Sequence, residues 1–392
     1  MLRQNSSVLL LAAALLAAAS PASGQSDAVQ TALHDYRVVT VADGFEIPWS
    51  IAFLPGGDIL VTEKVGRLRI IRDGKLLPDP VPGIPEVLVR GQGGLMDVVP
   101  HPDFANNRII YLSYSKSVQG LRAGTTVVAR GTFENDRFTL MDEIFTAVSD
   151  GSSHYGCRIA FDSEGYLFLS VGDRQARTIG DLTAHPAQDI SLHQGVIVRL
   201  HDDGSVPDDN PFVGQAGARP EIWSYGHRNP QGLVIHPETD AVWLTEHGPQ
   251  GGDEVNVSTA GANYGWPVIG YGVNYGSGTA IHGGTHAEGM EQPLHFWVPS
   301  IGVSGLAFYH GDKFPEWRGS LFAGGLSGGR VDRLTIEGGR VTGRETVFEG
   351  RGRVRDVREG PDGYIYIALE QRGRRGGGAT PTTPIVRLEP VG

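Results

Sequence analysis

Cysteine is almost absent from this chain of 392 residues, which contains only Cys157. One cysteine cannot form a disulfide within the chain, so the sequence excludes a fold held together by disulfide bonds. It also excludes a zinc site built from several cysteines. We interpret Cys157 as a small buried residue, since unpaired cysteines are commonly buried. Stability must therefore come from a hydrophobic core or from bound ions.

Long apolar segments are also absent once the N-terminus is set aside. Arg3 precedes a run of twelve apolar residues, 8–19, and the small residues 22–24 follow it. This pattern is typical of a secretory signal peptide, and we expect residues 1–24 to be cleaved. Twelve apolar residues are too few to cross a bilayer, which needs about 20. The sequence predicts a periplasmic or secreted protein that does not span a membrane.

Basic residues are in deficit, and extended helical patterns are missing. The 33 Lys and Arg residues face 44 Asp and Glu residues, which gives a formal net charge of −11. Proteins that bind nucleic acid usually present a basic face, so the charge argues against a nucleic-acid partner. No apolar stripe of helical spacing lasts beyond a turn or two, which argues against a helical fold.

Glycine and a repeated strand pattern take the place of helices. The chain contains 56 glycines, and six similar units begin at Pro48, Gly94, Cys157, Gln231, Ser304 and Arg355. In each unit an apolar strand, a turn rich in Pro, Asp and Gly, and a second apolar strand follow one another. The repeat predicts an all-β fold, a six-bladed β-propeller of four-stranded antiparallel sheets that forms one domain over residues 36–392. The segment 36–41 is expected to complete the last blade. A double-sheet sandwich, the alternative, explains the even spacing less well.

The register of the repeats brings polar residues together at one end of the predicted axis. We expect the first strand of each unit to be innermost, so that the residues around its start meet at one end of the central channel. These residues are Trp49, Gln92, His154, Arg228, Asn229, Ser304, Arg353 and Arg355. Arginine presents a planar fork of donors that matches carboxylates, and histidine can accept a proton at neutral pH. The set suits a flat ligand with several negative charges.

Familiar catalytic motifs are missing, and two local features stay open. The sequence has no Gly-x-Ser-x-Gly nucleophile turn and no His-Glu-x-x-His zinc motif. His154, in the stretch SSHYGCR, is either a catalytic base or a packed turn histidine. Gly248 and Pro249, in TEHGPQGGDEVN, either offer carbonyl oxygens to Ca²⁺ or form an ordinary turn.

Seven long motifs occur in a specific order along the chain. They are RGQGGLMDVVPHPDF, SHYGCRIAFDSEGYLFLSVGDR, AQDISLHQGVIVRLHDDGSVPDDNPF, EIWSYGHRNPQGL, EHGPQGGDEVN, GANYGWP and RVRDVREGPDG. With these motifs the chain resembles the soluble pyrroloquinoline quinone (PQQ)-dependent sugar dehydrogenases, the glucose and aldose sugar dehydrogenase family, over about residues 38–388. The resemblance implies a six-bladed propeller that binds PQQ and Ca²⁺ at one end of its axis.

The resemblance also implies a role for individual residues. His154 would take the proton of the sugar's anomeric hydroxyl while the C1 hydride passes to the quinone, and Arg228 would lie beside the reactive quinone oxygens. The implied cofactor contacts are Gln92, Arg228, Asn229, Arg353 and Arg355. The implied sugar contact is Asp173. The implied calcium ligands are the carbonyls of Gly248 and Pro249, with Glu254 and Tyr264 at a second, structural site.

The sequence departs from this family in three places that bear on function. Ser153, directly before His154, stands where the glucose enzymes have an acid that touches the site. Ser327 stands where the sugar dehydrogenases usually carry a lysine that pairs with PQQ, and Arg330 or His295 is a candidate to compensate. The loop 371–384 is a basic, glycine-rich insertion, interpreted either as a solvated loop or as a flap that contacts an electron acceptor.

Three functions are therefore weighed. The first is PQQ- and Ca²⁺-dependent oxidation of an aldose at C1 to the lactone, with electrons passing to an acceptor such as a cytochrome or a quinone. The second is a propeller without redox activity that binds carbohydrate or protein, which the serine at position 327 favours. The third is a metal-dependent propeller lactonase, which needs acidic residues at the axis where this sequence places His, Gln and Arg. The first function is the prediction.

Overall fold

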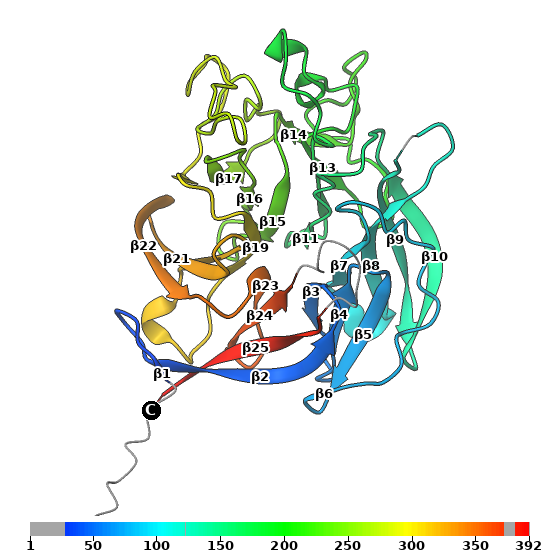
Figure 1. The fold of residues 1–392 in the computed structure, drawn as a ribbon. Coiled ribbons are helices and arrows are strands. Elements are labelled where there is room, and N and C mark those ends of the chain that lie inside the picture. The colour runs from blue at the N-terminus through cyan, green and yellow to red at the C-terminus, as the bar shows by residue number, and fades with distance from the viewer. Residues whose placement is uncertain (1–27, 122, 372–380, 392) are drawn as a thin grey trace, which may run out of the picture.

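The computed structural model describes residues 28–121, 123–371 and 381–391. In these residues six small antiparallel sheets surround a central axis, so the predicted six-bladed β-propeller is confirmed and the sandwich is excluded (Figure 1). The expected signal peptide, residues 1–24, lies outside the described residues, and so does most of the 371–384 insertion.

The strands follow the predicted repeats. The first sheet contains β3 (Pro48–Phe53), β4 (Ile59–Glu63), β5 (Arg67–Arg72) and β6 (Lys75–Leu76). The second contains β7 (Leu95–Pro100), β8 (Ile109–Lys116), β9 (Thr125–Glu134) and β10 (Arg137–Thr146). The third contains β11 (Ile159–Phe161), β12 (Leu167–Val171), β13 (Val196–Leu200) and β14 (Ile222–Tyr225). The fourth contains β15 (Pro230–Ile235), β16 (Val242–Glu246), β17 (Asp253–Ser258) and β18 (His295–Trp297). The fifth contains β19 (Val303–Phe308), β20 (Leu321–Gly325), β21 (Arg330–Glu337) and β22 (Arg340–Phe348). The sixth contains β23 (Arg353–Glu359), β24 (Ile365–Glu370), β25 (Thr383–Pro390), β2 (Tyr36–Phe45) and the short β1 (Ala28–Val29).

Helices are few and short in the described part of the chain. They are α1 (Phe104–Asn107) and the 3₁₀ helices η1 (Leu182–Ala184), η2 (Pro186–Gln188) and η3 (Pro315–Trp317). Among the described residues, then, no helix has the length and apolar character needed to cross a membrane.

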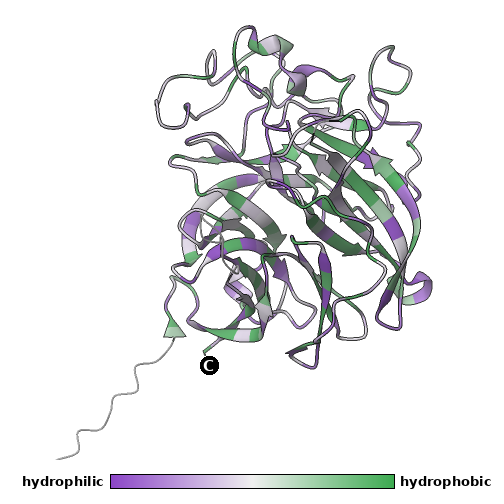
Figure 2. Ribbon diagram, turned by 45° about the vertical axis from the view of Figure 1, so that its right-hand side comes forward, coloured by the Kyte–Doolittle hydropathy of each residue, from purple (hydrophilic) through white to green (hydrophobic). Residues whose placement is uncertain are grey.

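The first strand of each sheet lies innermost, as predicted. β3, β7, β11, β15, β19 and β23 contact one another in sequence around the axis, and β23 closes the ring on β3. Both faces of each blade are covered by neighbouring blades, so strands such as β12 are buried along their whole length and are apolar at nearly every position. Figure 2 shows hydrophobic residues along the strands of the sheets. The packing fixes the inner strands, and with them the residues at their starts.

The two ends of the described chain close the ring. β2, which contains the predicted strand 36–41, pairs antiparallel with β25 over Tyr36↔Pro390 to Phe45↔Thr383 (Figure 1). The N-terminal strand thereby completes the blade that the C-terminal strands begin. Closure of this kind leaves no open edge between the first and last blades.

A buried network of charges joins the inner strands across the axis. Arg158 pairs with Asp356 at 2.9 Å and with Asp97 at 3.4 Å, and Arg358 pairs with the same two carboxylates at 3.0 and 3.2 Å. The carboxylates of Asp97 and Asp356 are fully buried. The backbone amide of Ile159 donates to Asp97 at 2.9 Å. Four charges that pair within one network hold the blades in register at the centre of the ring.

Candidate functional site

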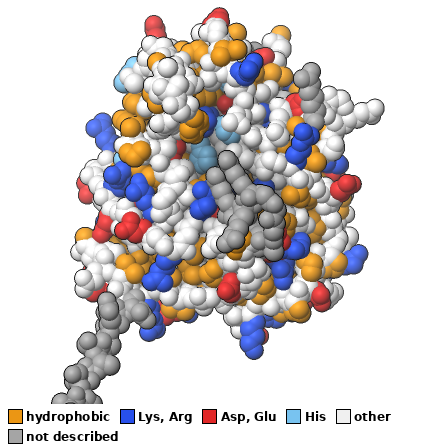
Figure 3. All heavy atoms as spheres, in the orientation of Figure 1, with side chains coloured by type: hydrophobic (Ala, Val, Ile, Leu, Met, Phe, Trp, Pro, Cys, Tyr) orange, Lys and Arg blue, Asp and Glu red, His pale blue; other side chains and the backbone are white. Residues whose placement is uncertain are grey.

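A cavity of about 650 Å³ opens at one end of the axis, where the inner strands start. Its lining comes from all six blades, and Figure 3 shows histidine side chains in the hollow near the centre of this face. The predicted residues that line it are Trp49, Gln92, His154, Arg228, Asn229, Arg353 and Arg355. Ser304 is the exception in the predicted set: it is fully buried, and its hydroxyl donates to the carbonyl of Val354 at 2.8 Å. The register of the repeats therefore correctly predicted that these residues converge on one cavity, apart from Ser304.

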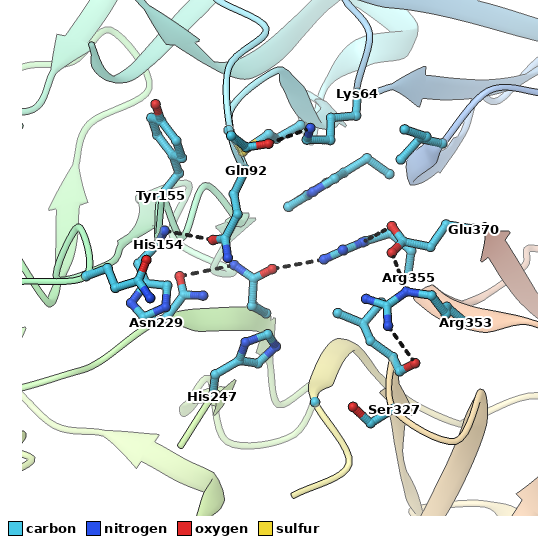
Figure 4. A pocket seen from close by; sticks show the side chains of 18 of the residues that line it. Lys64, Gln92, His154, Tyr155, Asn229, His247, Ser327, Arg353, Arg355 and Glu370 are labelled. Carbon is cyan, nitrogen blue, oxygen red and sulfur yellow. Dashed lines mark hydrogen bonds and ion pairs between the residues drawn. The ribbon is translucent and has the colours of Figure 1, made fainter. Parts of the chain in front are cut away.

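His154 is held in a fixed orientation on the cavity wall. Its φ angle of 47° lies in the left-handed region, which few residues other than glycine adopt. Its backbone amide donates to Oε1 of Gln92 at 2.8 Å, and the amide of Gln92 donates to the carbonyl of Ser152 at 3.0 Å. Gln92 thus fastens the histidine loop from the neighbouring blade (Figure 4).

Asp173 lies behind His154 and sets its protonation. Nδ1 of His154 is 2.6 Å from Oδ1 of Asp173, and Oδ2 of Asp173 accepts a hydrogen bond from Nε1 of Trp266 at 2.7 Å. A proton on Nδ1, donated to this carboxylate, leaves Nε2 with a lone pair. Asp173 is only 1% exposed and is not among the residues that line the cavity. The structure therefore shows Asp173 in contact with His154, and its contact with a sugar stays a prediction.

The surroundings of His154 favour its neutral form. Burial lowers the pKa of His154, Asp173 opposes this shift, and the cations Arg228 and Arg174 add to it. Burial disfavours the ionised form of Asp173, but His154 and Arg228 outweigh it and lower the pKa of the carboxyl. A neutral imidazole beside an ionised carboxylate is the arrangement that a general base requires.

Arg174 supports the histidine loop and was not singled out from the sequence. Its guanidinium lies 3.5 Å from the ring centroid of Tyr155 and donates to the carbonyls of Gly151, Gly124 and His154. The side chain is buried among these groups. The only sequence signal was its place directly after Asp173, because its partners lie in loops that are distant in the chain.

Arg228 and Asn229 enter the cavity from the start of β15. Nη1 of Arg228 donates to the carbonyl of Gly248 at 2.7 Å and to that of His247 at 3.1 Å. Its Nε is buried without a hydrogen-bond partner in the described structure. Oδ1 of Asn229 accepts from the amide of Gly156 at 3.2 Å, so it braces the same histidine loop. Arg228 thus has a donor to offer a ligand.

A cluster of charges faces His154 across the cavity (Figure 4). Arg353 and Arg355 pair with Glu370 at 2.8 and 2.9 Å, and Lys64 lines the same cavity. Burial disfavours the ionised form of Glu370, but the two arginines outweigh it and lower its pKa to about 2. Glu370 and Lys64 were not identified from the sequence, because one ends a strand and the other follows one, and nothing in their local motifs marks them.

The four predicted calcium ligands gather around a second, smaller cavity of about 20 Å³. Gly248, Pro249, Glu254 and Tyr264 line it together, and Arg228 and His247 line both cavities. Burial and the neighbouring Glu246 raise the pKa of Glu254 to about 8. Nδ2 of Asn256 donates to both acids, at 3.1 and 3.0 Å, and its Oδ1 is buried without a partner in the described structure.

The residues around the smaller cavity match a calcium site only in part. The oxygen-rich set around Glu254 matches the preference of Ca²⁺, and a cation there would relieve the crowding of Glu246 and Glu254. The carbonyl of Gly248 is already taken by Arg228, and that of Pro249 accepts from Ser300 at 3.3 Å. Within the described part of the chain, no group of three or more His, Cys, Asp or Glu residues is placed to hold a metal.

The propeller carries, at one end of its axis, a polar cavity whose lining includes His154, Arg228, Arg353 and Arg355. The sequence profile of the Glucose / Sorbosone dehydrogenase family matches residues 45–376. The chain belongs to this family. Its membership makes it a sugar dehydrogenase, which is a kind of oxidoreductase.

Relatives and solved structures agree with this assignment. The chain is 44% identical over 354 residues to the aldose sugar dehydrogenase YliI of Escherichia coli (strain K12), an alignment that covers 88% of this chain and 93% of that protein. The crystal structure of the soluble aldose sugar dehydrogenase from Escherichia coli, in its apo form, superposes with a TM-score of 0.83 at 41% identity, covering 91% of this chain and 100% of that one. The PQQ-bound aldose sugar dehydrogenase from Streptomyces coelicolor superposes with a TM-score of 0.70 at 27% identity, covering 91% and 98%.

Proposed function

We propose that this protein is a quinoprotein that oxidises an aldose at C1 to the lactone, with PQQ as its cofactor. The observation that carries the proposal is the cavity at the end of the axis, where His154, bonded to Asp173 at 2.6 Å, faces a wall that contains Arg353 and Arg355. A PQQ-bound member of the same fold and family supports the choice of cofactor.

The residues present fit PQQ. The cofactor is a flat tricarboxylate, and arginine forks match carboxylates in geometry and charge. Arg353, Arg355 and Arg228 line the cavity, and Arg228 has a buried Nε without a partner in the described structure. When bound, PQQ would supply a quinone that accepts two electrons from the sugar. Arg353 and Arg355 would hold its carboxylates, and Gln92 and Asn229 would contact it from the opposite side.

The protein's own contribution to the reaction centres on His154. Nε2 would take the proton of the anomeric hydroxyl, the C1 hydrogen would leave with its electron pair as a hydride for the quinone that bound PQQ supplies, and the C1–O bond would become the carbonyl of the lactone. Asp173 holds the ring by Nδ1 and stabilises the imidazolium that forms. Arg174 and Gln92 keep the histidine loop in place, so the base does not need to reorganise during the reaction.

The acid limb of the pH profile should reflect His154. Burial lowers its pKa, so its neutral form persists below pH 6.5, and kcat/KM should fall only at more acidic pH. Asp173→Asn removes a group that raises this pKa, so the limb should move to still lower pH while kcat drops about 100-fold or more. The exposed Asp79→Asn serves as control. A limb at or above pH 6.5 in the wild type, or an upward shift in Asp173→Asn, would contradict this role.

Calcium is proposed as the second cofactor, bound by the acids of the smaller cavity. A ligand that binds only the folded state raises the melting temperature. Adding Ca²⁺ to protein stripped with a chelator should therefore raise the melting temperature, and Glu254→Gln should abolish most of that rise. Glu288→Gln, at an exposed acid, should respond as the wild type does. If Glu254→Gln and Glu288→Gln showed the same rise in melting temperature, calcium would not be bound at Glu254.

The remaining parts of the proposal concern location and partners. Residues 1–24 carry the pattern of a signal peptide, so we propose export to the periplasm or beyond the cell. An exported dehydrogenase needs an external electron acceptor, and a cytochrome or a quinone is the class proposed.

Reconstitution tests the function. Purified protein is assayed for dye reduction with a panel of aldoses, with and without PQQ and Ca²⁺. The proposal predicts activity that requires PQQ. Ser327 favours the second candidate, a propeller that binds carbohydrate without redox activity, and sugar binding in the absence of any PQQ binding would favour that candidate instead.

A further inference from the structure

Lys64 occupies a fixed position at the mouth of the cofactor cavity. It follows β4 directly, and its backbone amide donates to the carbonyl of Ile47 at 3.0 Å, while its carbonyl accepts from the amide of Leu95 at 3.2 Å. A Cβ on Gly94 would lie 2.0 Å from the Lys64 carbonyl, so glycine is needed for this close approach. The backbone of Lys64 is therefore clamped between two blades, and its side chain lines the cavity.

The two residues considered from the sequence as substitutes for the missing lysine do not reach this cavity. Ser327 lines it, but neither Arg330 nor His295 is among the described residues of its wall. Nε of Arg330 lies 3.7 Å from Asp332, and the ring of His295 packs at 4.6 Å against Trp297. Lys64, on the opposite side of the view from Ser327 in Figure 4, is the lysine that the described wall contains.

The charge of the cavity wall points to the same residue. Among the described residues that line the cavity, four are cationic, Lys64, Arg228, Arg353 and Arg355, and one is anionic, Glu370, which leaves a net charge of +3. This charge matches a tricarboxylate, whereas a wall without Lys64 would be one charge short. Nζ of Lys64 donates to the exposed carbonyl of Gly91 at 3.0 Å, a neutral partner, and Lys64 forms no direct ion pair with the residues that the structure describes.

The electrostatics of Lys64 show that it belongs to this charge cluster. Burial and the neighbouring Arg355 lower the pKa of Lys64, while Glu370 raises it. The ammonium therefore senses both members of the Arg355–Glu370 pair. An anion that enters between Lys64 and Arg355 would relieve the repulsion between the two cations.

We propose that Lys64 binds a carboxylate of the cofactor and supplies, from the first blade, the positive charge that Ser327 does not provide from the fifth. The inference rests on the proposed function, because it assigns a residue to the PQQ site. It explains how the cavity keeps its charge although the position of the usual lysine holds a serine.

The test measures PQQ binding directly, by isothermal titration calorimetry of protein loaded with Ca²⁺, in the absence of sugar. Lys64→Met should raise the Kd for PQQ about 10- to 100-fold, since a hydrogen bond to a charged group is lost. It should also flatten the dependence of the Kd on KCl concentration, because one charge contact is removed. Lys75→Met, at an exposed lysine on β6, should bind as the wild type does. Circular dichroism confirms that each variant is folded.

A second variant makes the assignment specific. Ser327→Lys, introduced into Lys64→Met, should recover most of the lost affinity, because it restores the net charge from the other side of the cavity. Equal Kd values for Lys64→Met and Lys75→Met would overturn the inference and leave the proposed function standing. A double variant that binds no better than Lys64→Met would overturn the claim that the two positions supply the same charge. Absence of PQQ binding to the wild type would overturn both the inference and the proposed function.

Discussion

Replacing His154 with alanine is expected to lower kcat for aldose oxidation by about 10²- to 10⁴-fold, the usual effect of removing a general base. PQQ binding should change little, because the surroundings of His154 favour its neutral form and the proposed anionic cofactor would be held by the cations on the facing wall. Loss of kcat with retained cofactor is the signature of a base. Steady-state dye reduction and PQQ titration on the same preparation measure both quantities.

The control for this variant is a histidine outside the cavity. His286 lies in an exposed loop, and His286→Ala should keep kcat at the wild-type value. If His154→Ala kept kcat within a few-fold of the wild type, the histidine would be a packing residue, and another group would have to remove the proton. Loss of PQQ binding together with kcat would instead make it a cofactor ligand.

Of the substitutions considered, Asp97→Asn should cause the largest decrease in the free energy of unfolding. The change keeps the shape of the side chain but leaves Arg158 and Arg358 with one fully buried carboxylate, Asp356, between them. Removing one member of a buried charge network costs about 3–5 kcal/mol, because the other charges remain buried without full compensation. The free energy of unfolding, from the urea midpoint, should fall accordingly.

An exposed ion pair provides the comparison for this loss. Asp142 pairs with Arg130 at 3.2 Å on the outer strand β10, and its side chain is 54% exposed. Asp142→Asn should change the free energy of unfolding by no more than about 1 kcal/mol. If the two variants unfolded at the same urea concentration, the axial network would contribute no more than a surface pair does.

The fold could be read from the sequence because it is periodic. Each blade repeats a strand, a turn and a second strand. A glycine with positive φ lies in that turn in four of them, at Gly57 (92°), Gly165 (88°), Gly319 (77°) and Gly363 (77°). The register then predicted which strand is innermost, and hence that His154 and Arg355 share one cavity. The fifth strand of the last sheet, β1, was not foreseen, since two residues carry no repeat signal.

The parts of the site that were missed depend on contacts between blades. Glu370 and Arg355 come from one blade, but Lys64 reaches the same cavity from another, and no local motif connects them. Arg174 supports His154 through carbonyls of other loops, which side-chain chemistry does not reveal. Sequence reasoning identifies residues that lie in distinctive local motifs. It misses residues such as Lys64 and Arg174, which reach the site only because the blades pack around the axis.

Mixing PQQ-loaded protein anaerobically with an aldose, in the absence of any dye, tests the central claim most directly. The account predicts that the absorbance of the bound cofactor shifts to that of its reduced form within a single turnover, with one equivalent of lactone formed for each PQQ. The same mixture with His154→Ala should stay in the oxidised form over that time. Tightly bound PQQ whose spectrum does not change with any aldose of the panel would contradict the account.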